Sequence, residues 1–146
     1  MGVSDPFNMG GAMAPAAVDT ITAHFRDMGL ASRDYDLIAT GDLGLIGFRI
    51  ARDLLKKHDL GIPDEIFTDC GLLIYGEDEP AVLAGGSGCG CSASVVYGHI
   101  MNRLNKGELK RVLIVATGAL LSPLSYQQKE SIPCIAHAVS IESNQV

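Results

Sequence analysis

The chain has 146 residues, of which 47% are hydrophobic and 19% are charged, and this balance predicts one folded domain over residues 1–146 rather than a disordered chain. The net charge is −6 and the pI is near 5.0, without a large cluster of Lys and Arg, which argues against nucleic acid as a partner. No apolar run approaches the roughly 20 residues of a membrane span, and the first residues do not form a signal peptide, so neither is expected.

Two helices and a strand are predicted in the first part of the chain. Pro15 suits the first turn of a helix, which apolar residues at helical spacing extend to Met28, with Gly29 as its terminator. Tyr35–Thr40 is typical of a short buried strand, and Gly41–Gly44 turns the chain into the second helix. The apolar face of that helix is expected to consist of Ile46, Ile50 and Leu54, with Ala51 and Leu55 beside it.

Strands and helices alternate through the rest of the chain. Ile66–Cys70 is predicted as a short strand and Ser92–Asn105 as a third helix. Arg111–Ala116 is the clearest strand because it is uninterrupted and rich in β-branched residues. Thr117–Pro133 is predicted to be irregular, and Ile135–Ile141 to be a last strand. This alternation indicates an α/β fold with layered helices on a sheet.

A Gly-rich run, Ala84–Ser92, leads into the third predicted helix. Small residues let backbone N–H groups approach a ligand closely, and the start of a helix favours carboxylate or phosphate groups. The same residues would equally let a helix pack tightly against a sheet. The run is neither GxGxxG nor a Walker motif, so the pattern supports neither dinucleotide nor ATP binding.

The four cysteines are expected to be reduced, because they are too sparse for a disulfide scaffold. Cys89 and Cys91 stand near the predicted helix start, where a thiol is either a packed residue, part of a pocket wall, or a reactive or metal-bound group. No second cysteine pair or histidine lies at ligand spacing, and we predict no metal site and no cofactor.

Outside the Gly-rich run, a hydroxyl-rich loop and four histidines are the other candidate functional groups. The loop Gly118–Ser131 follows the clearest strand, where α/β folds place ligands, although a solvated surface loop would have the same composition. His24 and His58 are predicted at the surface, and His137 in the core. His99 falls within the third predicted helix, and no Ser-His-Asp or Cys-His set can be assembled from spacing.

Longer strings of residues resemble a known family. Pro6–Ala16 resembles the segment that opens the C-terminal half of thiolases. Asn8–Thr20, Gly85–Ala93 and Ala116–Pro133 resemble the stage V sporulation protein AD family of the thiolase-like superfamily. The resemblance implies the C-terminal half of a thiolase-like fold on a mixed sheet, with the N-terminal half of the family absent.

The resemblance also implies a pocket without the thiolase chemistry. Thiolases carry a catalytic His in the Gly-rich turn and a Cys after the strand equivalent to Arg111–Ala116, whereas this chain has Gly86-Ser87-Gly88 and Thr117-Gly118-Ala119 there. A non-catalytic subunit is therefore expected. The alternative is a condensing acyltransferase that uses Cys89 or Cys91.

The ligand implied by the family is dipicolinic acid, alone or as its calcium chelate, taken up during sporulation. The family further implies membrane subunits of the same uptake complex as partners, a homodimer at full length, and a place in the cytoplasm or at the spore inner membrane. The residues expected to bind the ligand are Gly86, Ser87, Gly88, Cys89, Gly90, Cys91, Ser92, Ser122 and Lys129.

Overall fold

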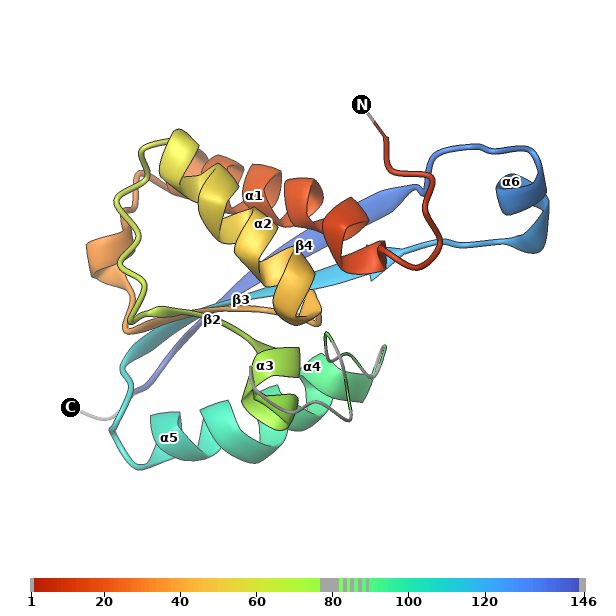
Figure 1. The fold of residues 1–146 in the computed structure, drawn as a ribbon. Helices are drawn as coiled ribbons and strands as arrows, with labels where there is room; N and C mark the ends of the chain where they lie inside the picture. Colours follow the sequence, from red (N-terminus) through yellow and green to blue (C-terminus); the bar gives the residue numbers. More distant parts are fainter. Residues whose placement is uncertain are drawn as a thin grey trace.

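The computed structural model describes residues 2–76, 82, 84, 86, 88 and 90–144. One four-stranded sheet separates two layers of helices, as Figure 1 shows. Its order is β2-β1-β3-β4, with β1 (Leu37–Thr40) parallel to β2 (Phe67–Asp69) and to β3 (Arg111–Ala119). β4 (Cys134–Glu142) runs antiparallel to β3. The predicted α/β class and the mixed sheet are confirmed, and the arrangement is consistent with part of a thiolase-like fold.

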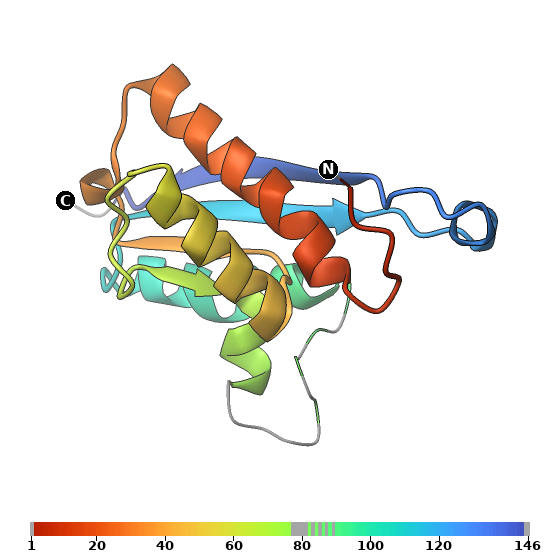
Figure 2. The same ribbon diagram turned by 45° about the horizontal axis from the view of Figure 1, so that its top comes forward.

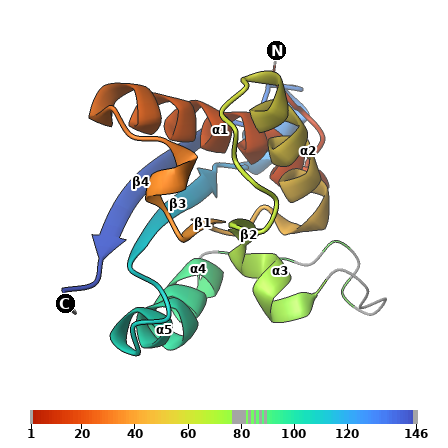
Figure 3. The same cartoon turned by 90° about the vertical axis from the view of Figure 1, so that its left-hand side faces the viewer.

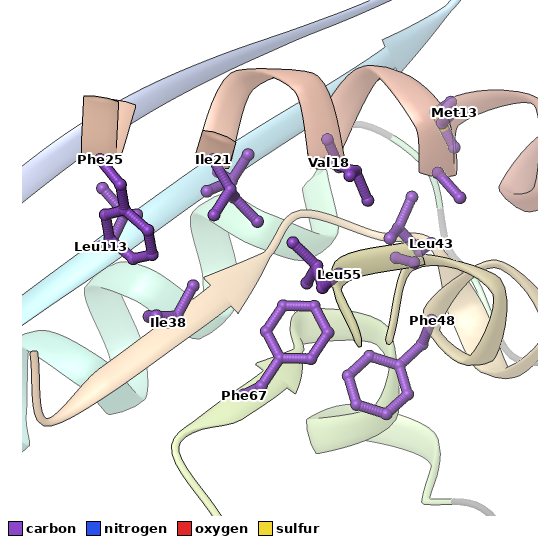
Figure 4. Packing of buried hydrophobic residues seen from close by; sticks show 14 of the residues in the cluster. Met13, Val18, Ile21, Phe25, Ile38, Leu43, Phe48, Leu55, Phe67 and Leu113 are labelled. Atoms are coloured by element: carbon purple, nitrogen blue, oxygen red, sulfur yellow. The ribbon is translucent and has the colours of Figure 1, made fainter. Parts of the chain in front are cut away.

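The first helical layer consists of α1 (Met9–Met28) and α2 (Gly44–Lys57), which pack side by side on one face of the sheet (Figure 1). Figure 4 shows their apolar side chains meeting those of the strands. Phe48 of α2 stacks on Phe67 of β2 with ring centroids 5.0 Å apart. Because strand side chains alternate between faces, Leu113 and Val115 of β3 join this core.

α1 begins six residues before the predicted start, so the prediction of Pro15 in the first turn was wrong. The Asn8 side chain caps the helix by accepting a hydrogen bond from the Gly11 N–H, and Pro15 lies inside the helix. The C-terminal prediction is confirmed, since Gly29 adopts a left-handed conformation with φ of 65°. Met28 is 64% exposed and lies outside the core.

The buried face of α2 differs from the predicted one. Ile46 is 51% exposed, and Ile50 and Leu54 are only partly buried. The buried face of α2 consists instead of Gly44, Gly47, Phe48, Ala51 and Leu55. The small residues of this face allow α1 and α2 to approach each other closely, which apolar spacing alone did not reveal.

The second helical layer covers the other face of the sheet and consists of α3 (Cys70–Tyr75), α4 (Gly90–Val95), η3 (Val96–Ile100) and α5 (Met101–Asn105), as the end-on view in Figure 3 shows. The last three form one helical run, in which η3 is a π-helical turn. This run confirms the predicted third helix, apart from an earlier start and the π turn. Its core joins Ile100 and Leu104 to Val112 and Ile114 of β3.

β3 and β4 extend beyond the helical layers as a two-stranded arm, which Figure 2 shows projecting from the body of the domain. Thr117–Ala119 continue β3, and α6 (Pro123–Gln127) forms the tip of the arm. The prediction of an irregular segment over Thr117–Pro133 was therefore wrong for the strand extension and for α6. The antiparallel register with Cys134–Ala136 supplies the long-range hydrogen bonds that hold this segment extended. The last predicted strand is confirmed, with one residue more at each end.

Two predictions for histidines were wrong. His24 is partly buried, and its Nε2 lies 2.6 Å from the Tyr35 hydroxyl. Burial lowers the pKa of His24. His137 is exposed, because β4 is an edge strand and this residue points away from α1. His58 is exposed, as predicted.

Candidate functional site

A cavity of about 640 Å³ lies where the carboxyl ends of β1 and β3 meet the first turn of α1. Ligands of α/β proteins bind at this edge of a sheet. The described lining comes from Pro6–Gly10, Gly41–Leu43 and Ala116–Ala119, together with Met13, Ile46, Ala84, Gly86, Gly88 and Ser92. Asn8–Gly10 place the positive end of the α1 dipole at this cavity.

A buried carboxylate, Asp69, holds the turn beside the cavity in place. It accepts hydrogen bonds from the N–H groups of Leu43 (2.9 Å) and Gly44 (3.2 Å), which begin α2, and of Gly71 (3.0 Å), which begins α3. The Thr40 hydroxyl donates to it at 2.6 Å. Burial raises the pKa of Asp69 against the effect of these hydrogen bonds. Asp69 is 0% exposed and therefore positions two helices rather than touching a ligand.

Asp42 links the turn after β1 to the Gly-rich segment and lines the cavity itself. Its Oδ2 accepts a hydrogen bond from the Gly88 N–H at 2.8 Å. The Leu45 N–H donates a hydrogen bond to the Ala84 carbonyl at 2.6 Å. This bond is a second link between the turn after β1 and the Gly-rich segment. Gly86 and Gly88 have φ of 127° and 79°, conformations that only glycine adopts without strain.

The structure separates the predicted ligand-binding residues into groups. Gly86, Gly88 and Ser92 line the cavity, whereas Gly90 begins α4 outside the lining. Cys91 is 2% exposed and packs in the second core with Cys70. Two further predicted ligand-binding residues, Ser122 and Lys129, lie at the tip of the arm. Ser122 caps α6, and Lys129 follows this helix. The predicted Ser87 and Cys89 lie outside the described residues.

The separation of Ser122 and Lys129 from the cavity has a physical cause. The sequence shows that both follow the strand that ends at the cavity, but β3 extends three residues beyond its predicted end. Because each residue of a strand advances the chain by about 3.3 Å, this extension and the residues after it carry the loop away from the sheet edge. Their contact with a ligand in this cavity is not supported by the geometry of this chain.

Sequence reasoning missed Asp42 and Asn8 as residues of the cavity. Asp42 directly follows a strand that was predicted, and a polar residue at the carboxyl end of a parallel strand is a signal that would have found it. Asn8 gave no such signal, because the helix that it caps was expected to begin later. Among the described residues, no group of three His, Cys, Asp or Glu side chains is placed to hold a metal ion.

Comparison with known proteins identifies the family of this chain. Residues 1–142 match the family model described as stage V sporulation protein AD. The chain belongs to the stage V sporulation protein AD family. It is 56% identical over 142 residues to stage V sporulation protein AD of Bacillus subtilis (strain 168), and this match covers 97% of the chain.

The chain spans 41% of the length of this curated relative. The family name ties the chain to sporulation. Within the described part of the chain, no helix is both long and apolar enough to cross a bilayer.

The buried cysteines of this family member are expected to be unreactive in the folded chain. Burial and the nearby carboxylate of Asp69 raise the pKa of Cys70 to about 12, so its thiolate is scarce at neutral pH. Cys91 shares the same core, which argues against a nucleophilic role. A thiol reagent at neutral pH should label Cys70 and Cys91 only after denaturant is added, as peptide mapping would show. Rapid labelling of Cys91 in the native chain would restore the acyltransferase alternative.

Proposed function

We propose that this chain forms part of a non-catalytic, thiolase-like subunit that binds dipicolinic acid for uptake during sporulation. The observation that carries the proposal is the cavity at the carboxyl ends of β1 and β3, whose described lining holds one ionisable side chain, Asp42. None of the described lining residues is Cys or His, so this part of the chain brings no thiol nucleophile or imidazole base to the cavity. Its volume falls within the range of small-molecule sites, about 300–1,000 Å³.

The groups around the cavity suit a small planar ligand that carries carboxylates. Asn8–Gly10 contribute the positive end of α1, and Gly86 and Gly88 leave the backbone open to close approach. Phe7 and Met9 add apolar surface for a pyridine ring. These features favour a flat, partly aromatic anion over an extended acyl chain.

Asp42 favours the calcium chelate of the ligand over the free dianion. A carboxylate beside a bare dicarboxylate would repel it, because like charges in a partly desolvated site destabilise each other. Calcium is bound by oxygen ligands such as carboxylates, so a chelated ion would turn this repulsion into attraction. The cation would then enter as part of the cargo.

The remaining parts of the proposal concern the full-length family protein. We propose that it works with membrane-embedded subunits of the same uptake complex, that it lies in the cytoplasm or at the spore inner membrane, and that it forms a homodimer. These proposals extend from the resemblance and from the sporulation family to which the chain belongs.

Calorimetric titration of the full-length family protein that contains this segment tests the ligand. We expect saturable binding of dipicolinate that is tighter with calcium than without it. Asp42→Asn should weaken binding of the chelate about tenfold, equivalent to about 1.4 kcal/mol. Asp64→Asn is the matched control, because Asp64 is an exposed carboxylate paired with Lys56 at 3.3 Å and does not line this cavity.

A further variant locates the site within the chain. Ser122→Ala should leave the affinity unchanged, because Ser122 lies at the tip of the arm. Circular dichroism checks that each variant is folded. Absence of saturable binding, with or without calcium, would refute the ligand, and equal loss in Asp42→Asn and Asp64→Asn would refute the cavity.

A further inference from the structure

Two adjoining cavities lie where the edge strand β2 meets α2 and α3, and both are lined by Arg52, Asp64 and Phe67. Their volumes are about 150 and 410 Å³. We call the two cavities together the Arg52 groove. None of its lining residues lines the cavity at the carboxyl ends of β1 and β3, so the groove is a separate feature of the described chain.

Apolar side chains from α2, β2, α3 and the loop before β2 line the Arg52 groove. Phe48 and Phe67 stack on each other, and Figure 4 shows the two rings side by side. The other apolar lining residues are Leu55, Ile62, Leu72 and Leu73. Leu73 is 45% exposed, so part of this apolar surface remains in contact with water. An occupant of the groove would therefore gain free energy by covering it with apolar groups of its own.

The guanidinium of Arg52 lacks an acceptor that a buried donor normally has. Its Nε is shielded from solvent, and no described residue accepts a hydrogen bond from it. Its Cζ lies 5.9 Å from the centre of the Phe48 ring, which supports the cation by a cation–π contact. A buried donor without an acceptor costs free energy, and the cost is larger for a charged group. A ligand that brings an acceptor to this guanidinium would remove the cost.

The other charged residues of the groove favour a ligand with a single negative charge. Lys56 pairs with Asp64 at 3.3 Å, whereas Arg52 forms no ion pair with a described residue. Asp59 also lines the groove and would repel a doubly charged group such as phosphate. One carboxylate matches the planar fork of one guanidinium, to which it can bind through two parallel hydrogen bonds.

We propose that the Arg52 groove binds a segment of a partner protein in which one Asp or Glu is flanked by apolar side chains. The carboxylate of this segment accepts hydrogen bonds from Arg52. Its apolar neighbours cover the stacked rings of Phe48 and Phe67 and the side chains of Leu72 and Leu73. A small free carboxylate such as acetate would leave these apolar walls uncovered, which is why a protein segment fits the groove better.

Selection of displayed heptapeptides on the full-length family protein that contains this segment tests the proposal. We expect the selected peptides to share one Asp or Glu between apolar residues, and calorimetry with the most enriched peptide gives its dissociation constant. Arg52→Met should raise this constant at least tenfold, because methionine keeps an apolar stem but removes the donors. Arg103→Met is the matched control and should leave the constant unchanged, because Arg103 pairs with Glu108 at 3.4 Å and does not line the groove.

A second comparison leaves the protein unchanged and alters the peptide. Replacement of the acidic residue of the peptide by its amide should raise the dissociation constant as much as Arg52→Met does. The melting temperature of Arg52→Met should not fall, because the buried Nε has no hydrogen bond to lose.

Several outcomes would overturn the proposal. These are the absence of any enriched peptide, enriched peptides without an acidic residue, and equal affinity of the wild type and Arg52→Met. Peptides that bind the 146-residue chain but not the full-length protein would also overturn it, because the rest of that protein would then occupy the groove. The affinity for dipicolinate enters none of these comparisons, so the proposal stands or falls separately from the ligand of the other cavity.

Discussion

Replacement of Asp69 by alanine is expected to lower the free energy of unfolding by about 3 kcal/mol or more, because each buried donor left without its acceptor costs about 1–3 kcal/mol. The variant would leave the N–H groups of Leu43, Gly44 and Gly71 without their side-chain acceptor, whereas the Thr40 hydroxyl would keep the Thr68 carbonyl at 3.2 Å. Since the three N–H groups lie at the starts of α2 and α3, both helices would lose the carboxylate that satisfies their first backbone donors. Urea unfolding followed by circular dichroism measures the change.

Asp64→Ala is the control for this prediction. Asp64 is a carboxylate beside a cationic neighbour, Lys56, and its side chain is 53% exposed. Exposed ion pairs contribute little to stability, so this variant should be nearly neutral. Similar losses in the two variants would show that the buried network of Asp69 does not hold the two helices.

Asp69 should also give the stability a dependence on pH. Burial raises the pKa of Asp69 in the folded chain, so the native state binds this proton more readily than the unfolded state. The contribution of Asp69 to the free energy of unfolding is therefore highest below the ordinary aspartate pKa, about 3.9. This contribution is lost as the pH rises through the raised pKa of Asp69 in the folded chain. Asp69→Asn should remove this part of the pH profile. An unchanged profile in Asp69→Asn would contradict the assignment.

The second large effect is expected from Gly47→Ala, which should cost about 2–3 kcal/mol, within the range typical of an overpacked contact. A Cβ on Gly47 would lie 2.6 Å from the carbonyl carbon and oxygen of Gly10, where α1 crosses α2. Backbone atoms cannot move aside as a flexible side chain does, so the two helices would have to separate. This cost exceeds the gain of about 1 kcal/mol that alanine brings to a helix. Thermal and urea unfolding measure it.

Gly98→Ala is the matched control, because Gly98 is also helical but a Cβ added to it would meet no other segment of the chain within 4 Å. It should be neutral or stabilising by up to about 1 kcal/mol. The two substitutions add the same methyl group, so a difference in sign isolates the contact between α1 and α2. Equal effects would show that this contact is not tight in solution.

Gly47→Ala should also weaken ligand binding in the full-length protein if the cavity is the binding site. Gly10 lines the cavity and is the residue that the new methyl group would displace. Gly98 does not line it. Binding of dipicolinate that survives Gly47→Ala in a folded variant would place the ligand elsewhere.

The sequence by itself determined the α/β class, the central strand and the family. Arg111–Ala116 is recognisable because a buried parallel strand needs an uninterrupted apolar run, and Gly29 because a left-handed helix end favours glycine. The family strings Asn8–Thr20 and Ala116–Pro133 were equally visible, since long strings do not depend on knowing what they contact. These features are local along the chain.

Only the tertiary structure decided which residues form the site and which edge stays open. Asp42 and Asp69 lie close together because β1 and β2 are parallel neighbours whose carboxyl ends reach the same edge of the sheet. The spacing of residues along the sequence does not reveal this order of strands. The inward face of α2 depends on the close contact of Gly47 with Gly10 of α1, a contact between two helices that local spacing does not show. The extended register of β3 with β4 moved Ser122 and Lys129 to the arm and left β4 at the edge, because hydrogen bonds between strands outweigh the local turn preference of the loop.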